Sequence, residues 1–190
     1  MASKLRFPVE LRPPRGFDPA DAETWPAVDG RLEFVDGRLL YMPPCGDAQG
    51  DVVAAGVGGF MGWIGRHPEF VVSTNEAGLR LAGASRGADI AVWRKVDCGP
   101  QTGGFRRVPP ILAVEVEGQD EDEAVLTEKA RWYLDHGVRV VWLVLWTTRE
   151  VVVIRPLETT RCGGADRMPA HPDLPDLDLA VAEFFRQLDG

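Results

Sequence analysis

The chain has 190 residues, of which 45% are hydrophobic and 26% charged, an ordinary globular composition with room for one sizeable core. Its formal net charge of −8 counts against broad, unspecific binding of nucleic acid, because affinity for phosphate comes largely from Lys and Arg. No run approaches the roughly 18 apolar residues of a membrane span, and the first residues lack a signal-peptide core, so we expect a cytoplasmic protein that does not contact a membrane. We expect a proline-rich arm at residues 1–26 and a single domain at residues 27–190.

The cysteines and histidines do not indicate a metal or disulfide framework. Cys45, Cys98 and Cys162 are odd in number and widely separated, so they are expected to be reduced thiols. The 3 histidines are also far apart in the sequence and lack the spacing of metal ligands. A zinc enzyme or a histidine-based nucleophile is therefore not favoured.

The first elements expected after the arm are a β-hairpin and a helix. Residues 32–35 and 38–42 are apolar runs joined by Asp36-Gly37, and an Asp-Gly turn between such runs is a strong hairpin signal. A helix is expected over residues 49–66, although it contains several glycines, each of which costs about 0.5–1 kcal/mol relative to alanine. The simplest interpretation is a small-residue face pressed against a sheet. A phosphate-binding loop is less favoured, because no Lys-Ser/Thr follows these glycines.

The remaining residues predict strands, two further helices and a glycine-rich loop at residues 98–104. Strands are expected at residues 70–73, 77–81, 89–93, 111–117, 138–145 and 151–154, with a turn at residues 86–88. Helices are expected from Asp120 to His136 and over residues 179–188. This order predicts an α/β fold in which helices pack on a mixed sheet.

Four charged residues on adjacent elements predict a catalytic site. Asp89 opens one strand, Glu115 and Glu117 lie on one face of an otherwise apolar strand, and Lys129 lies on the next helix. Metal-assisted cleavage of a phosphodiester needs such a set, because hard cations take oxygen ligands and a lysine stabilises developing negative charge.

Other interpretations of the same residues stay open. Asp89 alone reads as a strand-end cap and Lys129 as a solvated helix residue, while Glu115 would then form a structural salt bridge. The acidic run from Asp120 to Glu123 reads as helix-end electrostatics. Several arginines near Asp89 in the sequence offer either a local polyanion site or a mixed-charge surface.

The ordered motifs resemble the Uma-type putative restriction endonuclease family of the PD-(D/E)XK nuclease superfamily over roughly residues 32–188. The matching segments are Leu32-Glu33-Phe34-Val35-Asp36-Gly37-Arg38-Leu39, Met42-Pro43-Pro44, Ala88-Asp89-Ile90, Leu112-Ala113-Val114-Glu115-Val116, Lys129 through Tyr133 to Gly137-Val138, Trp142, and Leu174-Pro175 to Phe184-Phe185. Each segment alone is a weak signal, whereas the ordered set is fairly specific.

The resemblance implies a restriction-endonuclease-like fold with an N-terminal β-hairpin and a site for Mg²⁺ or Mn²⁺. Asp89 would be the aspartate of the PD element and Glu115 the acid of the next motif, with the Val116 carbonyl as a third oxygen ligand. Lys129 would be the motif's lysine, relocated to the helix, where it would orient or activate the attacking water. Glu33 matches an acidic position near the site and would add a ligand.

Three positions depart from the family pattern. Ala88 replaces the proline of PD, and Gln49 stands near the place where a histidine is expected at the start of the first helix. Glu117 occupies the superfamily's lysine position, where it either serves as an additional metal ligand or disrupts the site.

Three functions from different classes follow from these residues. We expect an endonuclease that hydrolyses DNA, with a homodimer as the arrangement suited to cutting a duplex. The first alternative is a catalytically inactive nuclease-fold protein that acts in binding or assembly. The second is a hydrolase that uses Asp89 and Glu115 as an acid and base pair on a sugar.

Overall fold

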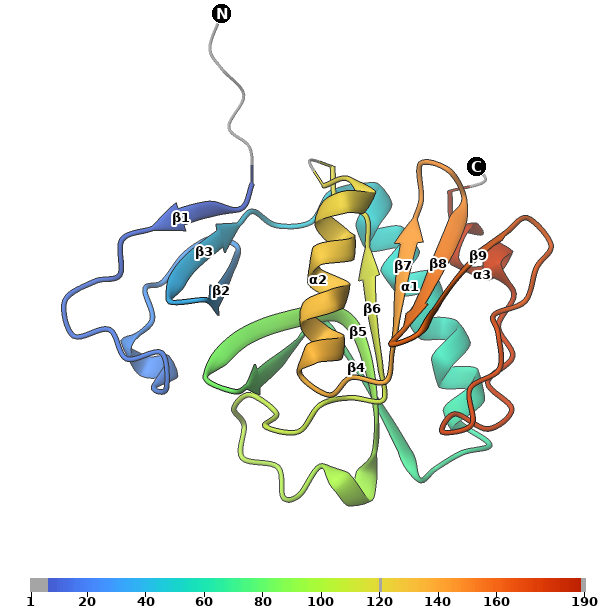
Figure 1. Cartoon of the computed structure of the whole chain (residues 1–190), viewed down its shortest axis with the longest axis horizontal. Coiled ribbons are helices and arrows are strands. Elements are labelled where there is room, and N and C mark those ends of the chain that lie inside the picture. The colour runs from blue at the N-terminus through green and yellow to red at the C-terminus, as the bar shows by residue number, and fades with distance from the viewer. Residues whose placement is uncertain (1–6, 120, 189–190) are drawn as a thin grey trace, which may run out of the picture.

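The computed structural model describes residues 7–119 and 121–188, which form one mixed sheet with helices on both faces (Figure 1). The described strands are β1 (Val9–Leu11), β2 (Arg31–Val35), β3 (Arg38–Met42), β4 (Phe70–Leu81), β5 (Ala84–Arg94), β6 (Leu112–Val116), β7 (Val140–Leu145), β8 (Glu150–Arg155) and β9 (Glu158–Gly163). The described helices are α1 (Asp47–Ile64), α2 (Glu123–Asp135), α3 (Val181–Phe185) and the 3-10 turns η1 (Ala22–Thr24) and η2 (Lys95–Asp97). None of them is long and apolar enough to cross a membrane.

The sheet is antiparallel except where β6 and β7 run parallel. The strand order is β1-β3-β2-β5-β6-β7-β8-β9, and β4 pairs with β5. The parallel pair is joined by α2, which is the usual crossover between parallel strands. The expected α/β architecture is confirmed, and it places the long strand β5 at the centre of the sheet.

The N-terminal hairpin is confirmed, and its turn has the expected chemistry. Asp36 and Gly37 both adopt positive φ angles, 51° and 76°, as a turn that matches the twist of two antiparallel strands requires. The expected arm also contains β1, which pairs with β3 and was not predicted. The hairpin and the edge strand β1 therefore form the end of the sheet near the N-terminus (Figure 1).

The prediction of a turn at residues 86–88 and a strand that begins at Asp89 is wrong. These residues lie inside β5, which pairs with β4 along most of its length, and the chain reverses at Ala82 and Gly83 with φ angles of 48° and 87°. The two strands expected at residues 70–73 and 77–81 form the single strand β4, whose register shifts between Thr74 and Ala77. Gly87 lies opposite Gly78 in this ladder, so its glycine marks a paired strand position instead of a turn.

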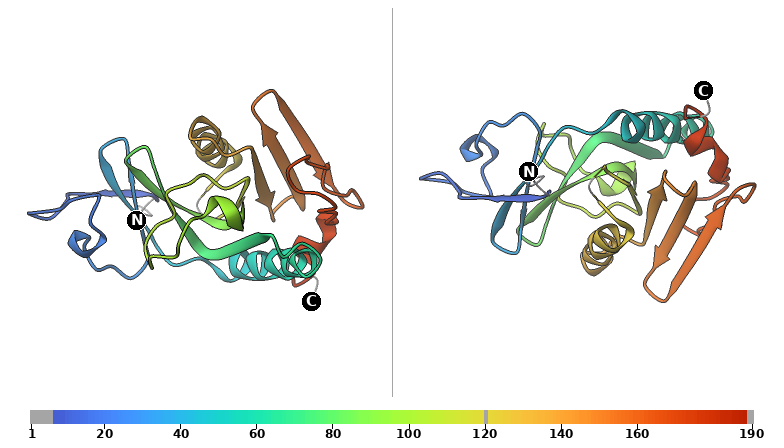
Figure 2. Two further views of the ribbon diagram at one scale, coloured as in Figure 1. Left: turned by 90° about the horizontal axis from the view of Figure 1, so that it is seen from below. Right: turned by 90° about the horizontal axis from the view of Figure 1, so that it is seen from above.

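The core has two parts, one on each face of the sheet. Helices α1 and α3 pack on one face and α2 on the other, as the end-on views show (Figure 2). The glycine-rich face of α1 contacts mostly the C-terminal segment: a Cβ built on Gly56 would lie 2.8 Å from the Phe184 ring, and one on Gly59 would lie 3.0 Å from Leu179. The final helix is shorter than the expected residues 179–188, and β9 was not predicted.

Candidate active site

Strand β5 changes its neighbour at the place where Asp89 lies. Ser85 pairs with Phe34 of β2, whereas Ile90 pairs with Val114 of β6. The strand therefore leaves one partner and joins another within five residues, and polar groups can gather where the sheet divides. One step back along the β5–β6 register from Ile90 brings Asp89 opposite Glu115, on the sheet face that α2 covers.

Helix α2 adds a lysine and a tyrosine to this pair. Lys129 and Tyr133 are four residues apart, so they lie on the same side of the helix. The Lys129 Nζ atom is 3.5 Å from Glu115 Oε2, and the Tyr133 hydroxyl donates a hydrogen bond of 2.7 Å to Glu115 Oε1. Glu115 is only 1% exposed, so both of its oxygens have partners in the protein interior.

Asp89 is tied to β6 and to the start of α1. The Val116 N–H donates to Asp89 Oδ2 at 2.7 Å. The Gln49 amide nitrogen lies 3.5 Å from the same oxygen and donates to the Val116 carbonyl at 3.3 Å. Asp89, Glu115 and Lys129 are thus brought together from two strands and one helix, and we call these three residues the buried cluster.

Burial raises the pKa values of both carboxylates in the buried cluster. Removal from water raises the pKa of Glu115 to about 7, Lys129 lowers it and the neighbouring Asp89 raises it further. Burial also raises the pKa of Asp89, opposed by Arg31 and by the Val116 N–H. The site therefore holds two carboxyl groups whose negative charge is not fully compensated.

Lys129 has more negative neighbours than one carboxylate can provide. Burial disfavours its charged form, but Glu115, Glu121 and Glu33 together raise the pKa of Lys129 above its ordinary value. Its ammonium group pairs with Glu121 as well as with Glu115. The pKa values of both partners are raised, because Lys129 lies among three acids whereas the burial of Glu115 outweighs the stabilising effect of Lys129. Lys129 is therefore held in its charged form.

Glu33 lies beside the cluster and is bound by arginines. It is 2% exposed, accepts a hydrogen bond of 3.2 Å from the Gly87 N–H, and its Oε2 lies 3.3 Å from Arg86. Arg31 lies 4.0 Å from the other carboxylate oxygen. The negative charge of Glu33 raises the pKa of Lys129, but the described contacts of Glu33 are made to residues of β2 and β5.

The structure does not bring Glu117 to the other acids. Strand β6 ends at Val116, so the alternation that would put Glu117 beside Glu115 stops there. The Glu117 carboxylate instead accepts hydrogen bonds from the Thr147 N–H at 3.1 Å and hydroxyl at 2.7 Å, and its carbonyl accepts from the Trp146 indole at 2.9 Å. Its described contacts hold the turn between β7 and β8.

The donor set of the cluster fits a hard divalent cation in its chemistry. Within the described residues, no three Asp, Glu, His or Cys side chains are arranged to hold a metal ion. Two carboxylates and the Val116 carbonyl nevertheless supply the oxygen atoms that Mg²⁺ and Mn²⁺ prefer. The mutual repulsion of Asp89 and Glu115 gives a cation at this place an electrostatic advantage.

Three residues of the site were not assigned a functional role from sequence. Tyr133 was not given a role of its own, although its spacing of four from Lys129 could have placed it here. Gln49 stands near the place of the missing histidine and bonds both Asp89 and the Val116 carbonyl. Glu121 was read as helix-end electrostatics, a role that Asp122 performs by accepting a hydrogen bond from the Val125 N–H. No sequence signal places Glu121, because it lies in the loop before α2.

Comparisons with known proteins give the fold and the family of the chain. The chain has the nuclease-like fold of a solved structure described as a putative nuclease belonging to DUF820 from Anabaena variabilis, with a TM-score of 0.78 and 17% sequence identity. The match covers 90% of this chain and 99% of the other. The model of the Uma2 family, described as "Putative restriction endonuclease", matches residues 19–182, so the chain belongs to that family. No curated protein matches the chain.

Proposed function

We propose that this protein is an endonuclease that hydrolyses phosphodiester bonds of DNA with the help of Mg²⁺ or Mn²⁺. The observation that supports it most directly is the meeting of Asp89, Glu115 and Lys129 in one buried cluster. Family membership and the nuclease-like fold point to the same chemistry. The cytoplasmic location and the homodimer stay predictions.

Each residue of the cluster has a separate role in the proposed reaction. Asp89, Glu115 and the Val116 carbonyl would hold the cation, which supplies positive charge against the scissile phosphate when it is bound. Lys129, kept charged by its acidic neighbours, orients the attacking water and stabilises charge on the phosphoryl oxygens. Tyr133 fixes the Glu115 carboxylate, and Gln49 fixes Asp89 and the Val116 carbonyl.

The test is cleavage of supercoiled and single-stranded DNA with Mg²⁺ or Mn²⁺. Asp89→Asn and Glu115→Gln remove the charge that would hold the cation, with almost no change of shape. We expect losses of activity on the order of 1,000-fold, which corresponds to about 4 kcal/mol of barrier. Glu117→Gln is the matched control, because its carboxylate is bound to the β7–β8 turn. Equal activity of the wild type and the two cluster variants would assign cleavage to a contaminant or to another site.

A catalytically inactive binding protein is the second candidate. The pairing of Lys129 with Glu121 favours it, because a lysine neutralised by two carboxylates is less available to a phosphate. Binding of DNA without cleavage by any metal-loaded form, unchanged in Asp89→Asn, would support this alternative. Cleavage that depends on Asp89 would exclude it.

A further inference from the structure

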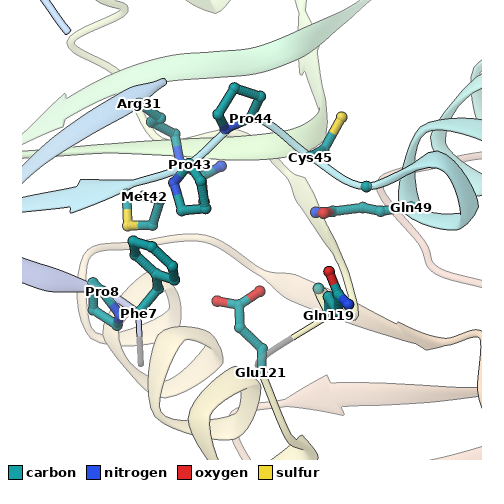
Figure 3. Close-up of a pocket in the computed structure, with 12 residues that line it drawn as sticks. Phe7, Pro8, Arg31, Met42, Pro43, Pro44, Cys45, Gln49, Gln119 and Glu121 are labelled. Atoms are coloured by element: carbon teal, nitrogen blue, oxygen red, sulfur yellow. The ribbon is translucent and has the colours of Figure 1, made fainter. Parts of the chain in front are cut away.

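A cavity of about 250 Å³ opens next to the buried cluster, between the start of α1 and the loop that precedes α2 (Figure 3). Two of its lining residues contact the cluster directly. Gln49 lies against Asp89 and the Val116 carbonyl, and Glu121 pairs with Lys129. Both side chains point into the cavity in Figure 3. The cavity is therefore one side chain away from the proposed reacting groups.

The walls of this cavity differ in chemistry. One side is mostly apolar and also carries the Arg31 side chain; its apolar residues are Phe7, Pro8, Met42, Pro43 and Pro44. On the other side lie Gln49, Gln119 and Glu121, which offer amides and a carboxylate. An apolar wall with an aromatic ring facing a polar wall beside a proposed phosphate-cleaving site suits a nucleotide, which has a flat base at one end and a sugar-phosphate at the other.

The size of the cavity and the burial of the cluster limit what can reach it. Glu115 is 1% exposed, and Asp89 and Lys129 are each 7% exposed. A DNA duplex, whose major groove alone is about 12 Å wide, cannot enter a cavity of about 250 Å³. A single nucleotide taken out of the stack is of the right scale, as in enzymes that extrude a base into a pocket.

We propose that this cavity binds one unpaired nucleotide next to the scissile phosphate, so that the substrates of the enzyme are single strands, bulges and other sites of unpaired bases. The base lies against Phe7 and Met42, and the sugar-phosphate lies toward Gln49, behind which the buried cluster begins. This inference rests on the proposed nuclease function for its catalytic consequence, but the binding of the nucleotide can be measured without cleavage.

The binding test uses one DNA sequence in three forms: a perfect duplex, a duplex with one bulged 2-aminopurine, and a single strand with 2-aminopurine. In EDTA, we expect the wild type to bind the two unpaired forms at least tenfold more tightly than the duplex and to change the fluorescence of the analogue. Phe7→Ala removes the ring, and stacking losses of this kind weaken binding about tenfold. Phe7→Leu keeps apolar bulk without a ring, so its affinity for the unpaired forms should lie between those of the wild type and Phe7→Ala.

The matched control is Phe17→Ala, which removes a ring from the same N-terminal region. Phe17 packs on Trp25 and Phe34 and does not line the cavity, so its variant should bind the bulged DNA as the wild type does. Circular dichroism and thermal unfolding verify that each variant is folded. Equal affinity of the wild type for all three DNA forms, or unchanged binding by a folded Phe7→Ala, would overturn the proposal.

Cleavage of the same three DNA forms separates this inference from the proposed function. Binding of the unpaired forms that depends on Phe7, with no cleavage that depends on Asp89, would retain the nucleotide site and refute the nuclease. Asp89-dependent cleavage of the perfect duplex as fast as the bulged duplex would retain the nuclease and refute the nucleotide site. Preferred cleavage at the bulge, lost in Asp89→Asn and weakened in Phe7→Ala, is the result expected if both are right.

Discussion

The stability of the metal-free protein should depend on pH through Glu115. In an unfolded chain a glutamate ionises near pH 4.5, whereas burial raises the pKa of Glu115 to about 7 in the folded protein. Between these two values the folded state holds a proton that the unfolded state has released. The free energy of unfolding therefore falls as the pH rises through this window, and Glu115→Gln should remove that loss.

The magnitude follows from the difference of about 2.5 pH units between the two states. At about 1.36 kcal/mol for each pH unit, the Glu115 contribution is fully present below pH 4.5, and about 3 kcal/mol of it is lost once the pH is above 7. Glu115→Gln keeps one oxygen that accepts a hydrogen bond from Tyr133 or Lys129, replaces the other oxygen by an NH2 group, and removes the negative charge, so it resembles the protonated carboxyl group. We expect this variant to match the wild type near pH 5 and to exceed it by up to about 3 kcal/mol at pH 8.

The assay is urea-induced unfolding in EDTA at pH 5, 6, 7 and 8, with EDTA present so that no divalent cation binds. Because Asp89 is also buried with a raised pKa, the free energy of unfolding of Glu115→Gln should still fall with rising pH, but less steeply than that of the wild type. Glu128→Gln removes an exposed carboxylate of α2 and retains Glu115, so the slope due to Glu115 should persist. A Glu115→Gln protein with the full wild-type slope would refute the reasoning, because the burial of Glu115 would then carry no electrostatic cost.

Three further outcomes are expected. Tyr133→Phe removes the hydroxyl that donates to a buried carboxylate and should lower the free energy of unfolding by about 1–3 kcal/mol at pH 8; unchanged urea unfolding would mean that this hydrogen bond has no net effect. Gly56→Ala should lower the melting temperature, because its Cβ would lie 2.8 Å from the buried Phe184 ring. Gly62→Ala has nothing within 4 Å of its Cβ and should raise the free energy of unfolding by about 0.5–1 kcal/mol. Equal shifts of the same sign in the two variants would contradict this packing. Mn²⁺ should raise the melting temperature of the wild type and not that of Asp89→Asn; equal stabilisation of both would place the cation elsewhere.

Much of the fold was readable from local signals. The Asp36-Gly37 turn was predicted correctly, and the apolar strand expected at residues 111–117 is present as β6, one residue shorter at each end. The long β4–β5 hairpin was not, because Gly87 resembles a turn residue until its pairing with Gly78 is known. Strand β9 carries mostly polar residues and has no apolar pattern that predicts a strand. It forms because its backbone pairs with the neighbouring strand β8.

The sequence by itself determined which chemical groups this protein brings to its site: carboxylates on two strands and a lysine on the following helix. The tertiary structure decided which of them meet. Asp89 lies beside Glu115 because β5 changes its partner from β2 to β6. Glu117 binds the β7–β8 turn instead of joining the other acids, because β6 ends at the residue before it. The tertiary structure also added Glu121 and the neighbouring cavity, which depend on long-range packing that no local pattern encodes.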